Sequence, residues 1–466
     1  MAVYKCDVCD YCYDESKEGV QWADLPDDWV CPVCGSAKAY FKLVGSTAPA
    51  PPRSAEAAED AVDKYRRTAD DLETLMADIH LMAETGTSII EPMRTKKPVA
   101  SWDDILIRGA QMARLPRNDG EPVATETVIG HKTKQPLVLQ TPVYISHMSF
   151  GALSRETKIA LAKGSALAGT AVCSGEGGIL PEELANAGKY IFEYVPNQYS
   201  VTEENFRRVD AIEIKIGQSS KPGMGGHLPG AKVTAEIAAV RGVPPGKDVI
   251  SPAHFRDIAT PEDLRKKIAW LREASGGKPI GVKIAAGHIE ADLAFILKAK
   301  PDFITIDGRP GATGASPKYV KAATSVPTIF ALHRARRFLD SAGANDVSLI
   351  ITGGLRVSSD FAKALALGAD AVAIATAALM ACGCQQYRVC HTGRCPVGIA
   401  TQDPELRKRL DIERSATRLA NFLRVCTSEL KDFARLTGND NVHSLSVGDL
   451  CTTNSEISGH TAIEHA

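Results

Sequence analysis

Four of the twelve cysteines stand within residues 382–398, "CGCQQYRVCHTGRCPVG". Cys384, Cys390 and Cys395 follow the spacing C-x5-C-x4-C, and Cys382 precedes them by two positions. Closely spaced thiolates with glycine and proline between and after them are typical of a wrapped iron–sulfur cluster. A structural zinc site prefers two C-x2-C pairs, which this run lacks. Inert buried thiols are the alternative, and the polar residues between the cysteines argue against it.

A second cysteine group lies in the first 42 residues. Cys6 and Cys9 form one C-x2-C pair, Cys31 and Cys34 form another, and four such thiolates can converge on one tetrahedral metal ion. Zinc and iron both accept this geometry. A unit of about 40 residues buries little core, so the metal and the aromatic residues around the pairs are expected to hold it together. Those aromatic residues favour iron, and a zinc ribbon is the alternative.

The composition sets limits on the partners and the compartment. The chain has 466 residues, a formal net charge of −2 and a hydrophobic fraction of 44%, which is ordinary for a globular protein. The chain has no excess of basic residues of the kind that would indicate nucleic-acid binding. The N-terminus "MAVYKCDVCD" lacks the features of an export signal, and no apolar run is long enough to span a membrane. We therefore expect a cytoplasmic protein in which thiols stay reduced and clustered cysteines hold metal.

The elements that must position these residues begin at about residue 140, where short apolar runs alternate with helical segments. This alternation predicts a parallel sheet, and about eight runs predict an α/β fold of the (β/α)8 TIM-barrel type. A doubly wound sheet is the alternative, but it would place G-x-G-x-x-G after its first strand, and that motif is absent. The predicted strands are 142–146, 171–175, 211–218, 280–286, 303–308, 328–332 ("TIFAL"), 349–354 and 371–376, and predicted helices include 153–169, 260–274 and 358–368.

Polar residues and glycines at the ends of these strands should face one mouth of the barrel. A lysine inside a barrel is costly unless it meets an anion, and glycines after the late strands let backbone N–H groups approach a phosphate. Together they predict a phosphorylated cofactor or substrate. If the glycines are considered without the lysines, tight turns after the strands explain them as well as a phosphate site does. The mouth residues are Ser146, Met148, Ser149, Glu176, Lys215, Gln218, Lys283, Asp307, Gly353, Gly354, Ala375 and Thr376.

Five segments follow from these patterns: a small metal-binding domain over 1–43, a linker over 44–60, a helical connector over 61–95, the barrel over 96–430 and a polar C-terminal tail over 431–466. The linker is rich in proline, alanine and serine, a composition that indicates flexibility. Residues 56–85 predict a helix, which we interpret as packing because apolar residues recur at helical spacing. Those apolar residues are Leu72, Leu75, Met76, Ile79 and Met82.

Residues 3–42 resemble rubredoxin at "YKCDVCDYCYD" and "LPDDWVCPVCGSAKAYF". Rubredoxins bind one iron and pass one electron at a time. Cys12 departs from that pattern, and with four ligands already present it is expected to be a spare thiol. The resemblance implies one rubredoxin-type iron held by Cys6, Cys9, Cys31 and Cys34, and this unit precedes the barrel as an N-terminal rubredoxin-like domain.

Residues 95–430 resemble the synthase domain of glutamate synthase. The shared motifs occur in the same order: "SHMSFGALS", "SGEGG", "KIGQSSKPGMGGHLPGAKV", "VISPAHFRDI", "GATGASP" and "RVCHTGRCPVGIATQDPELR". The resemblance implies an FMN-binding barrel and a 3Fe-4S cluster ligated by Cys384, Cys390 and Cys395, with Cys382 as a spare. Lys215 and Lys283 would face the flavin or the substrate. Glu176, Lys215, Gln218 and Lys221 would surround a 2-oxo acid.

The resemblance also implies a reaction, the reduction of 2-iminoglutarate or a related imine formed from a 2-oxo acid and ammonia or an amine. No room is expected for a glutaminase domain, so a separate glutaminase subunit is a possible partner. No nicotinamide site is visible, so electrons should enter through the rubredoxin-like iron from a reductase or a ferredoxin. A homo-oligomer is expected. The alternatives are an electron-transfer subunit of a larger complex and an N-methylglutamate synthase-like enzyme, because several motif positions near the mouth, such as Arg309 and Pro310, depart from the family.

Overall fold

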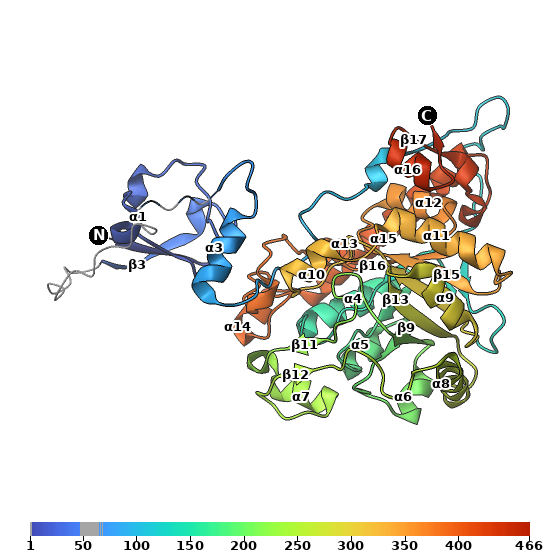
Figure 1. Ribbon diagram of the computed structural model, residues 1–466, viewed down its shortest axis with the longest axis horizontal. Helices are drawn as coiled ribbons and strands as arrows, with labels where there is room; N and C mark the ends of the chain where they lie inside the picture. Colours follow the sequence, from blue (N-terminus) through green and yellow to red (C-terminus); the bar gives the residue numbers. More distant parts are fainter. Residues whose placement is uncertain (1, 47–64, 66, 68) are drawn as a thin grey trace.

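The computed structural model describes residues 2–46, 65, 67 and 69–466. Within them the chain forms a small three-stranded domain at the N-terminal end and a much larger barrel beside it (Figure 1). The predicted linker over 44–60 lies outside the described residues from position 47 onward. None of the described helices is long and apolar enough to cross a membrane.

The small domain is an antiparallel sheet with the strand order β2–β1–β3. Its core is aromatic: the rings of Tyr4 and Trp22 stack with centroids 4.5 Å apart, and the ring of Phe41 lies 4.8 Å from that of Trp22. Such pairs stabilise a unit too small for a large aliphatic core. The elements are β1 (Ala2–Cys6), β2 (Cys12–Asp14), α1 (Glu15–Glu18) and β3 (Phe41–Ser46), with 3-10 turns at Trp22–Asp24 and Lys38–Tyr40.

The large part is a closed barrel of eight parallel strands, which confirms the predicted fold class. Most strand residues are buried because successive side chains point alternately into the barrel and toward the surrounding helices. Around the barrel the strands are β10 (Ala211–Lys215), β13 (Ile280–Ala285), β14 (Phe303–Asp307), β15 (Ser348–Thr352), β16 (Ala371–Ile374), β7 (Val143–Ile145), β8 (Ala171–Cys173) and β9 (Lys189–Tyr194).

One predicted strand is wrong. The run 328–332 begins a helix, α11 (Thr328–Ser341), in which Ile329, Leu332 and Leu339 are buried at helical spacing. Pro327 stands immediately before the first helical residue, a position that suits the fixed backbone angle of proline. The strand preference of the β-branched residues at the start of the run is therefore outweighed by the helical spacing of apolar residues that continues after it.

The eighth strand of the barrel is β9, which the sequence patterns did not single out. Its sequence, KYIFEY, carries Lys189 and Glu193, and charged residues weaken the signal of a buried strand. Glu193 is nevertheless buried, with 2% of its surface exposed. This buried carboxylate belongs to the charged interior described below.

Helices surround the barrel, and the three predicted ones are present as α4, α8 and α12 (Figure 1). The main hydrophobic core lies between these helices and the outward side chains of the strands. The helices after each strand include α4 (Arg155–Leu167), α5 (Pro181–Asn186), α6 (Glu203–Arg208), α7 (Ala235–Arg241), α8 (Pro261–Ala274), α9 (Ile289–Leu297), α10 (Lys318–Ala323), α12 (Ser358–Ala366) and α13 (Thr376–Cys382).

A hairpin closes the amino end of the barrel. It consists of β5 (Thr127–Ile129) and β6 (Leu137–Leu139), and its apolar side chains join one core cluster with inward residues of the barrel strands, such as Tyr144 and Phe303. Gly130, in the hairpin turn, donates its N–H to Ser348 Oγ at the start of β15. Because this end is filled with side chains, a ligand can enter only from the opposite end, where the strands finish.

The C-terminal residues are folded onto the barrel, so the prediction of a polar tail over 431–466 is wrong. A 25-residue helix, α15 (Ile412–Leu436), packs along α4. After it, β17 (Leu450–Thr452) pairs antiparallel with β4 (Ile105–Ile107) and parallel with β18 (Glu464–His465). Buried apolar residues are few and widely spaced in this region, and the sequence pattern therefore looked polar. The remaining elements are β11 (His227–Leu228), β12 (Val249–Ile250), α14 (Pro404–Arg407) and α16 (Ser455–His460).

A helix is predicted over 56–85, but within the described part of this range the helix covers only its last ten residues. It is α3 (Met76–Thr85), and the preceding residues form a turn in which Asp70 Oδ1 accepts hydrogen bonds from the N–H groups of Leu72 and Glu73. A side-chain cap of this kind competes with helix formation. None of the α3 residues is buried, so the interpretation of this segment as packing is wrong as well.

Candidate functional site

The four-cysteine site (Cys6, Cys9, Cys31 and Cys34) is assembled as predicted. All four sulfur atoms lie within 4.8 Å of one another, with Sγ–Sγ distances of 3.6 Å between Cys9 and Cys31 and 3.8 Å between Cys6 and Cys34. Four thiolates at such distances can bind one tetrahedral metal ion. Burial raises the pKa of the Cys9 thiol, and a bound cation would favour the thiolate form instead.

Two similar backbone turns, one at each C-x2-C pair, position the four cysteines. The N–H of Asp10 donates to the Cys6 carbonyl at 3.0 Å, and the N–H of Gly35 donates to the Cys31 carbonyl at 2.8 Å. Both donors have left-handed backbones, with φ of 62° at Asp10 and 73° at Gly35. Each C-x2-C pair is therefore wrapped by a residue four positions after its first cysteine, and glycine suits this conformation best.

Residues 382–398, from the end of α13 onward, are called the three-cysteine segment after the three predicted ligands Cys384, Cys390 and Cys395. Burial, with a smaller effect from the charges of Cys384 and Cys395, raises the pKa of Cys390 to about 12. Gln386 Nε2 donates to Cys384 Sγ at 3.2 Å. Among the described residues, Cys384, Cys390 and Cys395 do not form a group with all sulfurs within 4.8 Å, as the four-cysteine site does. An iron–sulfur cluster can bind each cysteine through a different iron, so its ligands need not lie that close together.

The fourth cysteine of this segment, Cys382, is the last residue of α13 and packs into the main core. Burial raises the pKa of its thiol to about 12. Cys395 lies in the same core, and Cys384 and Cys390 pack against it, so the role of Cys382 as a spare stays a prediction.

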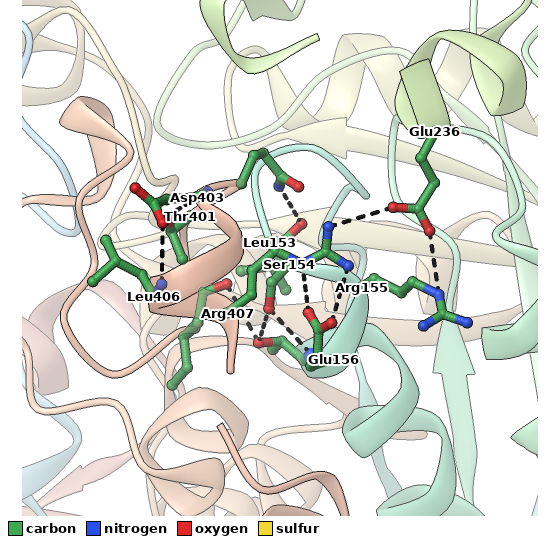
Figure 2. A network of polar contacts seen from close by, with 12 residues as sticks. Leu153, Ser154, Arg155, Glu156, Glu236, Thr401, Asp403, Leu406 and Arg407 are labelled. Atoms are coloured by element: carbon green, nitrogen blue, oxygen red, sulfur yellow. Dashed lines mark hydrogen bonds and ion pairs between the residues drawn. The ribbon is translucent and has the colours of Figure 1, made fainter. Parts of the chain in front are cut away.

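A polar network fastens the end of the cysteine segment to the barrel (Figure 2). Arg407, at the end of α14, makes two hydrogen bonds to the Glu156 carboxylate, at 2.8 and 3.0 Å, and lies 3.4 Å from Glu236 on α7. Gln402 donates to the carbonyls of Gly151 and Leu153, in the loop after β7. These contacts tie the residues after Cys395 to the loop that carries Met148 and Ser149, which adjoin the predicted flavin site.

At the barrel mouth, Glu176 after β8 meets Lys215 at the end of β10. Lys215 Nζ lies 2.6 Å from Glu176 Oε2, and both side chains are largely buried. Burial would raise the pKa of Glu176, but the charge and hydrogen bond of Lys215, together with Ser251, hold it below its ordinary value. Gly226 lies against this carboxylate, and a Cβ there would stand 2.5 Å from Glu176 Oε1. Glycine is therefore required in "GMGGHLPG" for the carboxylate to keep its place.

A small cavity opens beside this pair. Its volume is about 90 Å³, and the residues that line it include Glu176, Lys215, Met224, His254 and Phe255. Lys221 donates from Nζ to the Gly225 carbonyl at 2.9 Å, and burial lowers the pKa of its ammonium group. Of the predicted residues, Glu176 and Lys215 line this cavity, and Lys221 contacts Gly225, which lines it as well. The Gln218 side chain makes no hydrogen bond within the described part of the chain.

Lys283 lies beside Lys215 on the adjacent strand, because the two residues are paired in the register of β10 and β13. Lys283 Nζ is 3.8 Å from Asp307 Oδ2. Burial would lower the pKa of Lys283, but the charges of Asp307, Glu193 and Glu213 raise it. Both lysines therefore remain cationic inside the barrel and can attract an anion.

Several carboxylate oxygens in this interior lack hydrogen bonds from any described residue. They are Oδ1 of Asp307 and both carboxylate oxygens of Glu193. Buried polar atoms normally have hydrogen-bond partners. A large polar ligand would fit here if its anionic groups met the two lysines and its hydrogen-bond donors met these carboxylate oxygens.

The late strands end in the expected glycines. Gly353 has a φ of 116° and Gly354 a φ of 84°, and a Cβ would meet the Gly308 carbonyl oxygen at 2.1 Å and Pro310 Cγ at 2.5 Å. The backbone can take this path only with glycine at both positions. Ala375 and Thr376 follow the next strand, where α13 begins. Ser146 follows β7, where its N–H donates to the Ile374 carbonyl.

Two buried groups near the site escaped the sequence patterns. Lys158, on α4, lies 2.7 Å from Glu183 Oε1 and donates to the carbonyls of Met148 and Ser174, at 2.6 and 2.8 Å. It thereby joins the loops after β7 and β8 from behind. A lysine within the apolar run "KIALA" was the available signal.

The second missed group is an acid–base pair in the barrel. His147 Nε2 lies 2.8 Å from Glu213 Oε2, and His147 Nδ1 accepts the N–H of Gly175 at 3.2 Å. Burial would raise the pKa of Glu213, but the contact with His147 holds it below its ordinary value. This pair lies below the two lysines and supplies counter-charge to them.

Comparison with known proteins agrees with this geometry. Residues 56–440 match the family model described as the conserved region in glutamate synthase, and residues 3–41 match the rubredoxin model. The chain belongs to the glutamate synthase family. It is an oxidoreductase of the glutamate synthase type that carries a rubredoxin domain, as the sequence predicted.

Curated members of the glutamate synthase family share much of this chain. A glutamate synthase large subunit-like protein of Rhizobium meliloti is 38% identical over 84% of this chain and 93% of its own length. The archaeal glutamate synthase [NADPH] of Methanocaldococcus jannaschii is 40% identical over 79% of this chain and 78% of its own. That of Archaeoglobus fulgidus is 37% identical over 95% of this chain and 90% of its own. Among solved structures, a mandelate oxidase with an FMN adduct has a TM-score of 0.47 at 18% identity, over 75% of this chain and 88% of that one.

Proposed function

We propose that this protein binds FMN in its barrel and reduces 2-iminoglutarate, formed from 2-oxoglutarate and ammonia, or a closely related imine. Electrons would enter through a rubredoxin-type iron in the four-cysteine site. The observation that carries the proposal is the close pair of Lys215 and Glu176 beside a cavity at the barrel mouth. Cationic and anionic groups within 2.6 Å can bind a carboxylate substrate and handle a proton at the same place.

The FMN would be held by groups at the carboxyl ends of the strands. Lys283 and Lys215 supply positive charge, and the free acceptors of Asp307 and Glu193 suit donor groups on a flavin ring. The glycine turn at Gly353 and Gly354 leaves room for a phosphate to approach the backbone. When bound there, FMN would supply the hydride for reduction of the imine carbon.

The chain's own residues would do the remaining work. Lys215 and Lys221 would bind the carboxylates of a dicarboxylic 2-oxo acid. The Glu176 carboxylate is ionised near neutral pH because its pKa is lowered, so it could hold an ammonium ion or accept a proton from it. The segment after Cys395, fastened by Arg407 to Glu156, would keep a 3Fe-4S cluster beside the flavin.

The nitrogen source and electron donor are proposed separately. Nitrogen would come as free ammonia or an amine, or from a separate glutaminase subunit. Electrons would come from a ferredoxin or a reductase; relatives whose names include NADPH make such a reductase a reasonable source of them. The name "large subunit-like" of one relative also supports a second candidate, a synthase subunit of a multi-subunit complex. An N-methylglutamate synthase-like reaction would differ only in the amine.

Analysis of the purified protein tests the cofactors. Anaerobically purified protein should carry one FMN and about four irons, one in the four-cysteine site and three in the cluster. Steady-state assays with 2-oxoglutarate and ammonia, methylamine or glutamine would separate the three candidate reactions. Protein without flavin, or with zinc and no iron in the four-cysteine site, would contradict the proposal.

Removal of the small domain tests the route of the electrons. Its strands pair only with one another among the described strands, so deleting residues 1–45 should leave the barrel folded. The shortened protein should bind FMN and be reduced by dithionite, yet lose turnover with a one-electron protein donor. Turnover equal to that of the full chain would place the entry of electrons elsewhere.

A further inference from the structure

One side chain of the barrel enters the core of the small domain. The apolar cluster around the four-cysteine site contains Tyr387, which belongs to the three-cysteine segment. Its other members all come from the small domain: Cys6, Val8, Cys9, Tyr11, Cys31, Cys34 and Phe41. A residue of the segment that carries one ligand set thus packs against the cluster that contains the other.

Tyr387 also lies close to both sets of thiols. In the sequence it lies midway between Cys384 and Cys390. Its ring packs against the cluster that contains Cys6 and Cys31, so one side chain adjoins both ligand sets.

The backbone on either side of this tyrosine is strained. Gln386 has a φ of 59° and Arg388 a φ of 58°, the left-handed region that residues other than glycine rarely adopt. Such conformations persist only where the surrounding structure imposes them, and they gather at functional sites. Here the side chain of Gln386 is fixed by its hydrogen bond to Cys384 Sγ. The result is a short loop that projects Tyr387 away from the barrel.

An ion pair also joins the three-cysteine segment to the small domain. Arg394, in the three-cysteine segment, contacts the carboxylate of Asp10, which is the left-handed residue that closes the first C-x2-C turn. Lys5 also lies 2.8 Å from Asp10. The Arg394 and Asp10 side chains are 56% and 38% exposed, so salt screens the pair and it should orient the small domain rather than hold it.

We propose that Tyr387 is a positioning residue that docks the four-cysteine site onto the three-cysteine segment of the same chain, with Arg394 and Asp10 guiding the approach. The electron-transfer part of this inference rests on the proposed function, whereas the docking does not. One electron would leave the ferrous iron of the small domain, making it ferric, and enter the oxidised iron–sulfur cluster. No bond forms or breaks, and the Tyr387 ring keeps its electrons and its proton.

Photocrosslinking of the full chain tests the docking without any turnover. With p-benzoylphenylalanine in place of Tyr387, irradiation should join position 387 to residues 6–11 or 31–41 of the same molecule. The control is the same replacement at Trp270, which is 44% exposed on α8, at the opposite end of the molecule from the small domain (Figure 1). Position 270 should give no crosslink to the small domain. Crosslinks from 387 only to the barrel, or only to another copy in a mixture of isotope-labelled chains, would overturn the docking.

Substitutions that alter the contact in graded steps provide a second measurement. Tyr387→Phe keeps the ring and should leave electron transfer from the small-domain iron within about twofold of wild type, whereas Tyr387→Ala should slow it at least about tenfold. Both variants should keep wild-type iron content and the absorption spectrum of the four-cysteine site. Equal rates in Tyr387→Ala and wild type would overturn the role of the ring, even if the barrel proves to bind FMN as proposed.

Reversal of the ion pair separates guidance from packing. Arg394→Glu should reduce the crosslink yield at low salt, because it places two carboxylates together, and Asp10→Lys in the same chain should restore it. At high salt the wild type and Arg394→Glu should converge. Unchanged crosslinking in Arg394→Glu at low salt would rule out guidance by this pair.

Discussion

Lys215 Nζ and Glu176 Oε2 lie 2.6 Å apart across the barrel mouth, one at the end of β10 and the other in the loop after β8. Gly226 backs the carboxylate so closely that a Cβ there would stand 2.5 Å from Glu176 Oε1. Both side chains line the cavity at the mouth, so a substrate must fit beside the pair.

Glu176→Gln should lower kcat/KM for ammonia-dependent turnover by about 100-fold or more, the range for losing a positioned acid–base group. FMN content should stay near wild type, because Lys283 and the glycine turn are untouched. The matched control is Glu182→Gln, whose partner Arg155 lies at the outer surface, and it should keep activity. Turnover of Glu176→Gln within tenfold of wild type would exclude a chemical role for the carboxylate.

Lys283→Gln should reduce bound FMN by about tenfold or more, since it removes a buried cation that a charged ligand would contact. The measurement is the ratio of flavin to protein absorbance after gel filtration. Lys278→Gln is the control, because Lys278 is also buried but donates to the Arg207 carbonyl outside the mouth. If both variants keep full flavin, Lys283 does not hold the cofactor.

Glu183 should make thermal stability depend on pH. Burial raises its pKa from 4.5 to about 7, although Lys158 opposes the shift. Since the folded pKa lies above the unfolded one, the stabilisation is complete below pH 4.5 and is lost as the pH rises through about 7. The melting temperature should therefore fall between pH 5 and 8, and Glu183→Gln should flatten this slope. Glu182→Gln should leave the slope as in wild type.

Cys390→Ser should remove the cluster irons and leave the spectrum of the four-cysteine site intact, because the two ligand sets lie on separate parts of the chain. Iron should fall from about four to about one per chain. Cys382→Ser should keep all of it, since the family resemblance gives Cys384, Cys390 and Cys395 as the three ligands. Equal iron loss in both variants would mean that Cys382 is also a ligand.

The sequence predicts most of what repeats in this fold. Each strand and helix of a barrel shows a hydrophobic pattern within its own residues. The helices α4 and α8 and the strands rich in β-branched residues can therefore be predicted from those residues alone. β9 escapes because its carboxylate, Glu193, is needed by lysines on other strands, and tertiary demand of this kind leaves no local signal. The helix α11 is mistaken for a strand because its first five residues are read without the helical period behind them.

The candidate site divides in the same way. Cys6 belongs to a motif whose spacing predicts metal binding, and the structure places its sulfur near those of the other three cysteines. Glu176 and Lys215 also belong to sequence motifs, and the structure places them in contact with each other. Lys158 and Tyr387 act through contacts with residues far away in the chain, so no spacing announces them. The prediction for α3 is wrong for the opposite reason: its apolar residues have helical spacing, yet none of them is buried.

The pairing of β4 with β17 bears on how the chain is made. Thr452, in β17, donates to the Asp104 carbonyl, 348 residues earlier. At about 5 to 20 residues per second, a ribosome needs roughly 20 to 70 seconds to add that many residues. For all of that time Ile105–Ile107 has left the ribosome without its partner strand. Its edge must be kept from pairing with neighbouring nascent chains, so expression as a fragment that stops before residue 450 should favour aggregation.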